Sequence, residues 1–435
     1  MNILLIGSGA REHAIARALE RSPKKKRINC LASSVNPGLI KLCSEIKIGN
    51  INDPKSVSRY AKERSIRLAI IGPENPLANG VADALWDEGV KVVGPKKELA
   101  QIETSKSFTR DLLVEYKIPG CPNYRTFSSM NGVVSFLNEL GENYVVKYDG
   151  LAGGKGVRVA GDHLHSQDDA LSYCQELVSR GDEFVIEEKL FGQEFSLMSF
   201  CDGSTLKHMP AVQDHKRAYE GDTGPNTGGM GTYSDTNHSL PFLNDNDIAK
   251  ARDINTSTVR ALKDKFGAGY KGVLYGGFIA TAKGIKLIEY NARFGDPEAM
   301  NVLPLLESDF VEICNGVACG TLENVDVKFQ HKATVCKYAV PEGYPDSPMK
   351  GGPIDVSSIE NPDSLFYASV DIQNGQLVEA GSRTVAVVGI ADSISEAEVI
   401  AEKEISSVTG PLFHRTDIGT DKVVQKRVDH MNSLR

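Results

Sequence analysis

Three polar side chains at the end of one predicted strand have the types and spacing of an ion-binding site. Residues 286–290 carry apolar β-formers and predict a strand, and a Gly-Asp-Pro sequence at 295–297 then turns the chain. Because alternate residues of a strand share a face, Glu289 and Asn291 point the same way, and Arg293 follows them if the strand continues. A carboxylate, a carboxamide and a guanidinium beside a glycine turn predict a site for a hard cation and an anion. A solvated strand end is the alternative.

A glycine-rich segment at 144–159 also indicates chemistry. Strand formers flank a loop, so the order is strand–loop–strand, whereas a Walker-type phosphate loop leads into a helix and has Ser or Thr after its lysine. Glycines let backbone N–H groups approach oxyanions, and Lys147 and Lys155 supply positive charge. The segment therefore predicts a phosphate-binding loop with a plain β-hairpin as the alternative; its glycines are Gly150, Gly153, Gly154 and Gly156.

Acidic residues end the next predicted strand, at 183–186. Glu187 and Glu188 follow it directly, and Glu194 lies a turn further on. Carboxylates beside a phosphate loop would repel the phosphates, so in a nucleotide site they fit the adenine amino group or the ribose hydroxyls. Surface acids without a ligand are the alternative.

Residues 213–231 predict a long loop with almost no apolar content, five glycines and a dense mixture of charges. A structureless segment of this length inside a compact domain is usually functional or disordered. Apolar segments flank it, and its residues are too varied for a linker. We therefore favour a binding loop.

The N-terminal segment predicts a strand, a glycine turn and a helix, which invites comparison with dinucleotide-binding folds. The fingerprint of those folds needs a third glycine, where this chain has Glu12, and an acid after the second strand, where it has Ala32-Ser-Ser34. A dinucleotide site is therefore disfavoured. The helix start, with Arg11 and His13 in its first turn, suits a sugar phosphate, and a purely structural tight turn remains the alternative.

Composition excludes several classes of protein. The formal net charge of −8 argues against nucleic acid as the main partner. The eight cysteines are scattered without zinc-type spacing, which is typical of free thiols in a reducing compartment. The sequence has no signal-type start and no apolar run of about 20 residues. We expect a soluble cytoplasmic protein that does not associate with membranes.

The remaining segments predict the elements that position these residues. A parallel-sheet unit is expected from strands at 2–6, 28–32, 44–48, 67–71 and 90–93. A single polar helix is expected over 98–117, and a helix over 246–265 precedes an antiparallel pair at 272–280 and 285–290. The C-terminal part predicts a small α+β unit without a chemical constellation, with strands at 332–340, 365–370, 376–379 and 384–390 and a helix at 393–408.

Taken together, these stretches resemble ATP-grasp ligases, and specifically the phosphoribosylamine–glycine ligase family, over nearly the whole chain. Departures from the family pattern are small: Tyr148, Gln193 and Met300 replace the usual Ala, acid and Gln. The motifs that carry the resemblance are Leu5-Ile-Gly-Ser-Gly-Ala-Arg-Glu-His13, Gly72-Pro-Glu-Asn-Pro-Leu77, Lys147-Tyr-Asp-Gly-Leu-Ala-Gly-Gly-Lys-Gly156, Gln213-Asp-His-Lys-Arg217, Gly224-Pro-Asn-Thr-Gly-Gly-Met-Gly231 and Glu289-Tyr-Asn-Ala-Arg-Phe-Gly-Asp-Pro-Glu298.

The resemblance implies a multidomain α/β and α+β architecture with the ATP-grasp fold. An N-terminal parallel-sheet domain at 1–100 would precede a split central domain at 101–121 and 190–325. A lid subdomain at 122–189 would clamp ATP against the central domain, and an α+β domain at 326–435 would pack alongside. We expect a monomer.

The resemblance also implies roles for individual residues. Catalysis would use Lys147, Asp214 and Arg293, with Asp214 able to bind the glycine ammonium and Arg293 either phosphate or the glycine carboxylate. Metal binding, of Mg²⁺ or Mn²⁺, would use Glu289 and Asn291. ATP would contact Lys106, Lys147, Gly150, Gly153, Gly154, Lys155, Gly156, Glu187, Leu190 and Glu194. The other substrates would contact Gly9, Arg11, Glu74, Asp214, Lys216, Arg293, Gly295, Asp296 and Pro297.

The implied reaction joins glycine to 5-phosphoribosylamine through a glycyl phosphate, with ATP as co-substrate, in purine biosynthesis. A different ATP-grasp ligase acting on another carboxylate is the main alternative, and the 213–231 segment distinguishes the two. A non-catalytic nucleotide-binding protein would be expected to lose the metal ligands, which this sequence retains.

Overall fold

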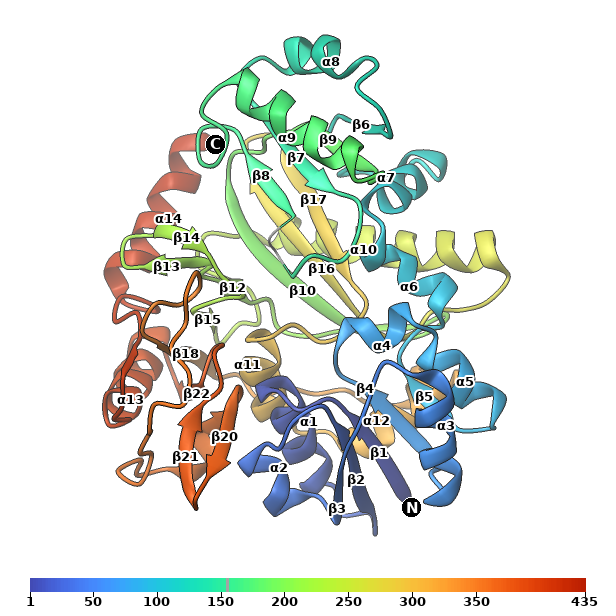
Figure 1. The fold of residues 1–435 in the computed structure, drawn as a ribbon, viewed down its shortest axis with the longest axis vertical. Coiled ribbons are helices and arrows are strands. Elements are labelled where there is room, and N and C mark those ends of the chain that lie inside the picture. Colours follow the sequence, from blue (N-terminus) through green and yellow to red (C-terminus); the bar gives the residue numbers. More distant parts are fainter. Residues whose placement is uncertain (154–155) are drawn as a thin grey trace.

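The computed structural model describes residues 1–153 and 156–435, so Gly154 and Lys155 of the predicted phosphate loop lie outside the described residues. The first sheet is the parallel one that the sequence predicts. Its strands run in the order β3-β2-β1-β4-β5, and the buried residues Ile3 to Ile6 place β1 at its centre. Its elements are β1 (Asn2–Ile6), α1 (Ala10–Glu20), β2 (Arg27–Ala32), α2 (Pro37–Leu42), β3 (Glu45–Ile48), α3 (Pro54–Glu63), β4 (Leu68–Ile71), α4 (Glu74–Ala78), α5 (Val81–Asp87) and β5 (Lys91–Val93) (Figure 1).

The single helix expected over 98–117 is in fact two helices, α6 (Lys97–Thr104) and α7 (Lys106–Glu115). Ser105 between them is extended, and its hydroxyl accepts a hydrogen bond from the Phe108 N–H at 3.0 Å. A serine at this position ends one helix and caps the next, which the apolar pattern alone does not reveal.

The segment expected to form the lid, residues 122–189, contains an antiparallel sheet in the order β6-β9-β7-β8, with an apolar core of its own that includes Phe136 and Phe184. The two strands expected at 144–159 are confirmed as β7 and β8. The lid elements are β6 (Tyr124–Phe127), α8 (Val133–Leu140), β7 (Tyr144–Tyr148), β8 (Val157–Val159), α9 (Gln167–Ser179) and β9 (Phe184–Glu188).

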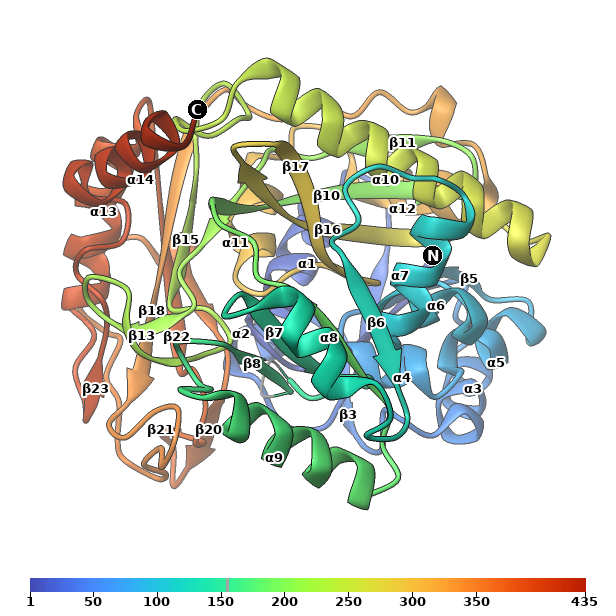
Figure 2. The ribbon, with the colours of Figure 1, turned by 90° about the horizontal axis from the view of Figure 1, so that it is seen from above.

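The central sheet is antiparallel, in the order β11-β10-β16-β17, and the predicted pairing of 272–280 with 285–290 is confirmed. Helix α10 covers one face of this sheet, and the lid strands β7 and β8 lie over the other (Figures 1 and 2). The elements are β10 (Gln193–Asp202), β11 (Leu206–His208), α10 (Asp245–Phe266), β16 (Lys271–Thr281), β17 (Gly284–Asn291), α11 (Glu298–Leu305), α12 (Phe310–Cys319) and the short 3₁₀ turn η1 (Leu322–Asn324).

The fourth sheet joins distant parts of the chain, because β12 pairs with β15, and β15 in turn pairs with β18, which pairs with β22 in the C-terminal part. The expectation that residues 213–231 lack regular structure was therefore wrong. The strand expected at 365–370 divides into β19 and β20, and α14 was not expected. The elements are β12 (Gln213–Asp214), β13 (Arg217–Tyr219), β14 (Thr223–Asn226), β15 (Gly231–Ser234), β18 (Ala333–Pro341), η2 (Pro362–Ser364), β19 (Leu365–Tyr367), β20 (Val370–Gln373), β21 (Gln376–Glu379), β22 (Val385–Ala391), α13 (Ile394–Ser406), β23 (Leu412–Phe413) and α14 (Asp421–Leu434).

The combination of one parallel sheet with several antiparallel sheets and their helices confirms the predicted multidomain α/β and α+β class. Within the described residues, no helix combines the length and the apolar character that crossing a membrane would require.

Candidate active site

A cleft of about 800 Å³ lies between the lid sheet and the central sheet. It is lined by β7, β8 and β9 on one side and by β16 and β17 on the other. The predicted site residues on its wall are Arg11, Glu74, Lys106, Lys147, Gly150, Gly153, Glu187, Leu190, Glu194, Asp214, Lys216, Glu289, Asn291, Arg293 and Asp296. Four others, Gly9, Gly156, Gly295 and Pro297, are each within two residues of a lining residue without lining the cleft themselves.

Strand β17 turns Glu289 and Asn291 into the cleft by means of a β-bulge. Gly277 of β16 pairs with Glu289 and Phe278 pairs with Leu287, so Ile288 is an extra residue in the ladder. A bulge of this kind re-aims the side chains that follow it. Both predicted metal ligands line the cleft, together with Ile288 and Tyr290 of the same strand. Arg293 comes after the strand, which ends at Asn291.

Lys147 on β7 is buried in an ion-pair cluster. Its ammonium contacts the Glu187 carboxylate and donates to the Ile288 carbonyl at 3.2 Å. The same carboxylate accepts from Arg110 of α7, with Nε–Oε2 and Nη2–Oε1 distances of 2.8 and 3.2 Å. Burial raises the pKa of Glu187, but the two adjacent cations outweigh this effect and hold that pKa below its ordinary value. Arg110 was missed in the sequence because it carries no motif signal.

Lys106 begins α7 and contacts the first part of the predicted phosphate loop. Its ammonium donates to the Gly150 carbonyl at 2.8 Å. Asp149, at the end of β7, accepts from the backbone N–H groups of Lys106 and Ser107 and from the Ser105 and Ser107 hydroxyls. A carboxylate at a helix N-terminus satisfies unpaired N–H groups and complements the helix dipole. The lid is thereby fastened to α7.

Arg293 lies between two carboxylates. Its Nη2 is 3.1 Å from Oε1 of Glu103 on α6, and its Nε is 3.4 Å from Oε2 of Glu74 on α4. Nη2 also donates to the Asn291 amide oxygen at 3.3 Å, which links Arg293 to a predicted metal ligand. Burial raises the pKa of Glu103, although Arg293 opposes the effect. Glu103 was not singled out in the sequence, where it appears as one acid in a polar helix.

Asp214 on β12 faces the cleft with an unpaired oxygen. Its Oδ1 is buried and has no hydrogen-bond partner among the described residues. Burial and the nearby negative charge of Glu298 raise the pKa of Asp214 to about 8, although Lys216 and Arg383 oppose the shift. Lys216 itself ion-pairs with Glu194, at 2.8 Å between Nζ and Oε2. A cation arriving beside Asp214 would restore its ionised form.

The N-terminal glycine turn serves mainly to hold elements together. Glu12 accepts from the Gly9 N–H at 2.5 Å and pairs with Arg11 at 2.7 Å, so the residue that replaces the third glycine caps α1. Arg11 also donates to the Phe294 carbonyl at 3.3 Å and lines the cleft. The His13 ring is buried and accepts from the Tyr367 N–H at 3.1 Å. His13 therefore packs against the C-terminal part instead of facing a phosphate.

The C-terminal part contributes to the cleft, contrary to the expectation that it carries no chemical constellation. Arg383 and Arg427 both line the cleft. Arg427 of α14 donates to the Gln193 side chain at 2.9 Å, and Gln193 in turn contacts His430 at 2.6 Å. Isolated arginines outside any motif gave no signal in the sequence, because only the fold brings them to the cleft.

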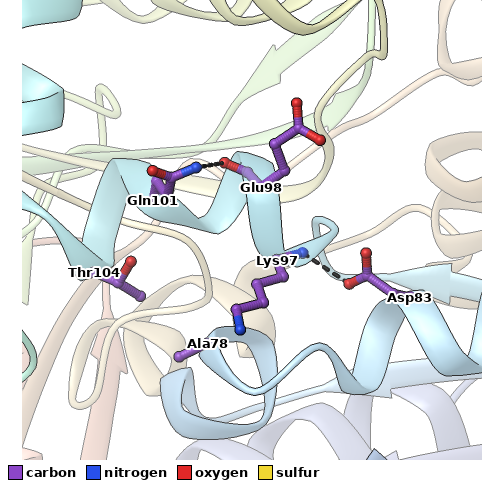
Figure 3. Close-up of a pocket in the computed structure, with 6 residues that line it drawn as sticks. All are labelled: Ala78, Asp83, Lys97, Glu98, Gln101 and Thr104. Carbon is purple, nitrogen blue, oxygen red and sulfur yellow. Dashed lines mark hydrogen bonds between the residues drawn. The ribbon is translucent and has the colours of Figure 1, made fainter.

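A second hollow, of about 360 Å³, lies along α6 (Figure 3). The Lys97 N–H donates to the Asp83 carboxylate at 2.8 Å, and the Gln101 side chain donates to the Glu98 carbonyl at 3.0 Å. None of the residues that line it was predicted to do chemistry. The larger cleft is therefore the candidate active site.

A cleft between two antiparallel sheets, with lysines on the lid and acidic and amide oxygens on the central sheet, defines the ATP-grasp class. Three family models divide the chain between them: the N domain of phosphoribosylglycinamide synthetase matches residues 1–103, its ATP-grasp (A) domain 104–299 and its C domain 334–421. The chain belongs to the phosphoribosylglycinamide synthetase family.

Individual relatives agree with this assignment. The phosphoribosylamine–glycine ligase of Methanosarcina barkeri is 50% identical over 435 residues, which cover 100% of both chains. That of Methanocaldococcus jannaschii is 48% identical over 445 residues, again with 100% of each chain covered. The crystal structure of the phosphoribosylamine–glycine ligase from Thermotoga maritima is similar with a TM-score of 0.81 and 26% identity, and the match covers 96% of this chain and 100% of that one.

Proposed function

We propose that this protein catalyses the ATP-dependent ligation of glycine to 5-phosphoribosylamine, giving glycinamide ribonucleotide, ADP and phosphate in purine biosynthesis. The observation that carries the proposal is the cleft, which gathers the family motifs from six separate stretches of a chain that matches the family throughout. We further propose that the protein acts as a monomer in the cytoplasm.

The chemistry follows from the poor reactivity of a carboxylate. The glycine carboxylate attacks the γ-phosphorus of ATP, forming glycyl phosphate and releasing ADP. The amine of 5-phosphoribosylamine then attacks the acyl carbon and expels phosphate. Both steps bring anions together, so the protein contributes mainly by positioning the reactants and balancing their charge. The lid over the cleft would exclude water, which otherwise hydrolyses an acyl phosphate.

Lys106 and Lys147 are the residues that we assign to the ATP phosphates. Their contacts with Gly150 and with Glu187 hold the two ammonium groups at the cleft in advance of ATP. Because both oxygens of Glu187 already pair with cations, we assign this carboxylate to positioning Lys147 and Arg110 rather than to the adenine. Leu190, through its backbone, is then our candidate for the adenine contact.

ATP-grasp ligases use a divalent metal ion together with ATP, and we assign its protein ligands to Glu289 and Asn291. The fit rests on the donor set: a carboxylate and a carboxamide on the cleft face of β17 are hard oxygen donors. Among the described residues, no group of three or more His, Cys, Asp or Glu is arranged to hold a metal, which disfavours a closed zinc-type site. Mg²⁺ and Mn²⁺ suit two protein oxygens and would neutralise phosphate charge when bound.

Asp214 is our candidate for the glycine ammonium group. Its unpaired Oδ1 faces the cleft, and a cationic ligand there would stabilise the ionised form of a carboxyl group whose pKa is raised to about 8. Arg293 is the candidate for an anion nearby, either the transferring phosphate or the glycine carboxylate. Since Glu74 and Glu103 already balance its charge, an incoming anion would compete with them for the guanidinium.

The direct test is ADP formation by the purified protein with MgATP and glycine, with and without 5-phosphoribosylamine, against a panel of other amino acids and carboxylates. We expect turnover only when glycine and the ribosylamine are both present. Turnover with another carboxylate and not with glycine would refute the proposal and favour the sister-ligase alternative.

Glu289→Ala tests the proposed metal site. We expect near-complete loss of ADP formation, because the remaining amide oxygen of Asn291 gives one neutral ligand in place of two donors, while circular dichroism and Tm stay close to wild type. Turnover at a rate comparable with wild type would remove Glu289 from the site.

A further inference from the structure

Arg383, which precedes β22, reaches from the C-terminal part into the cleft and joins two loops there. Its Nη1 donates to the carbonyls of Gly228 and Gly229, at 2.6 and 3.1 Å, and to the carbonyl of Asp296 at 3.1 Å. Its Nη2 lies 3.1 Å from the Asp296 carboxylate. The guanidinium is stacked 4.5 Å above the centre of the Tyr338 ring. The planar fork of arginine suits such simultaneous contacts, which a lysine cannot reproduce.

These two loops, at residues 228–229 and 296–297, pack around Asp214. A Cβ atom on Gly229 would be 2.6 Å from Asp214 Oδ1 and 2.8 Å from Pro297 Cδ, so these three residues are packed against one another. Gly229 has a φ of +107°, which only glycine adopts readily. The position of this glycine turn therefore fixes how much space remains beside the unpaired oxygen of Asp214.

A second residue of the C-terminal part supports the same arrangement. The Tyr338 hydroxyl donates to the Asp296 carboxylate at 2.7 Å, while its ring carries the Arg383 guanidinium. Arg383 is only 15% exposed, so loss of its side chain would leave one carboxylate and three carbonyl groups short of a donor in a mostly buried place. The turn at 228–229 is therefore held by Tyr338 and Arg383, which lie outside the ATP-grasp domain match at 104–299.

We propose that Arg383 is a positioning residue that holds the 228–229 turn and the 296–297 turn around Asp214, and so sets both the affinity for glycine and the rejection of larger amino acids. The inference rests on the proposed function, since it takes Asp214 as the site of the glycine ammonium. Among the described residues, Arg383 has no hydrogen bond or ion pair with the predicted ATP phosphate ligands or the predicted metal ligands. Its removal should therefore affect glycine and ATP unequally.

The experiment compares steady-state kinetics of Arg383→Lys and Arg383→Met with wild type. Loss of charge-assisted hydrogen bonds predicts a KM for glycine about tenfold to a hundredfold higher in Arg383→Met, with a smaller rise in Arg383→Lys. The KM for ATP should stay within about twofold of wild type. The ratio of kcat/KM for glycine to that for L-alanine should fall, because the turn no longer limits the space beside Asp214.

Arg64→Lys is the matched control. Arg64 also combines a carboxylate partner, Glu45 at 2.7 and 2.8 Å, with an aromatic ring, Tyr60 at 5.4 Å, and it does not line the cleft. We expect wild-type kinetics from this variant. If Arg383→Met does not fold, Tyr338→Phe tests the same inference, because it removes one hydrogen-bond donor to Asp296. We expect this variant to raise the KM for glycine about fivefold.

Two results would overturn the inference: unchanged glycine KM and unchanged selectivity in folded Arg383 variants, or equal losses for glycine and ATP. These results require that the wild-type protein turns over glycine. Failure of the proposed function would appear earlier and separately, as a wild-type protein that forms no ADP with glycine and 5-phosphoribosylamine.

Discussion

The charged side chains of the cleft are arranged in opposed groups. Lys147 pairs with Glu187, which also holds Arg110, and Arg293 lies between Glu74 and Glu103. A buried charge is costly unless an opposite charge compensates for it, so an empty phosphate site must supply its own counter-ions. The carboxylates keep the cations charged and in place until anionic ligands arrive.

Two variants separate the structural role of Lys147, its ion pair with Glu187, from its proposed contact with the ATP phosphates. Lys147→Met should lower the free energy of unfolding by about 1–3 kcal/mol, since Glu187 keeps only one of its cations. Adding Glu187→Gln should deepen this loss, because it leaves the buried Arg110 guanidinium without its carboxylate partner. Calorimetry should show ATP affinity reduced about tenfold or more in both variants. Unchanged ATP affinity in Lys147→Met would remove this lysine from the phosphate site.

Asp214 predicts a pH dependence of glycine binding. With a pKa raised to about 8, its carboxyl group is largely protonated at pH 7, and only the ionised form attracts an ammonium group. The KM for glycine should fall by up to about tenfold per pH unit between pH 6 and 8 and level off above. Asp214→Asn should raise the KM and flatten its pH profile, whereas the KM for ATP should follow the same profile in both proteins.

The same carboxyl group predicts how stability varies with pH. The folded-state pKa lies above that of the unfolded chain, so the folded protein binds the proton more tightly. Its contribution to stability is fully present below the ordinary pKa of about 4 and is lost as the pH rises through about 8. The Tm difference between Asp214→Asn and wild type should therefore shift in favour of the variant from pH 5 to pH 9. A difference independent of pH would contradict the raised pKa.

At the scale of elements, two irregular features place the site residues. The bulge at Ile288 aims Glu289 and Asn291 into the cleft, and it leaves the Ile288 carbonyl to accept from Arg110 at 2.6 Å and from Lys147 at 3.2 Å. The break between α6 and α7 at Ser105 places the N-terminus of α7 against Asp149 of the lid. The bulge thus connects the lid to the central sheet, and the break between α6 and α7 connects the lid to α7.

Asp149→Ala tests the connection between the lid and α7. Loss of this cap should cost about 0.5–2 kcal/mol and expose the first N–H groups of α7 to solvent. Amide hydrogen exchange at Lys106 and Ser107 should accelerate, while exchange in the distant helix α3 should not change. Equal protection in variant and wild type would show that Asp149 does not stabilise this end of the helix.

At the scale of the whole molecule, the C-terminal part completes the cleft. Strand β12 pairs with β15, and β15 pairs with β18, so the Gln213-Asp214 strand is connected through β15 to residues more than a hundred positions later. Arg415 holds the hairpin of β13 and β14 through Asp222 at 3.0 Å. On the same hairpin, Arg217 reaches the lid at Asp162, with an N–O distance of 2.8 Å. The hairpin therefore connects the lid to the C-terminal part.

The distribution of exposed apolar residues predicts the assembly state. The most exposed large apolar side chains in the described chain lie on separate segments rather than on one element: Ile40, Val114, Phe191, Tyr219 and Val399. Scattered apolar residues of this kind are normal on monomers, whereas stable interfaces need a contiguous patch. Sedimentation equilibrium should therefore give a mass near 47.2 kDa at micromolar concentration. A mass that is a multiple of this value would contradict a monomer.

Local patterns predicted most of the regular elements, since apolar periodicity and glycine turns act over a few residues. They predicted the parallel sheet, the strand–loop–strand of the lid and the pairing of β16 with β17. They failed at Ser105, where one polar residue ends a helix, and at 213–231, whose strands are defined by partners in the C-terminal part. The division into domains at 1–100, 101–121 with 190–325, 122–189 and 326–435 remains a proposal.

Residue types and spacing alone predicted the groups that could do chemistry: oxygen donors two residues apart at Glu289 and Asn291, a lysine-bearing glycine loop, and a family resemblance over nearly the whole chain. Those signals are local in the chain. How the charges pair could be seen only in the folded chain, because Glu103, Arg110 and Arg383 belong to no motif. Which opposite charges meet depends on the packing of elements far apart in sequence, and that packing is also what places Asp214 beside the turn that Arg383 holds.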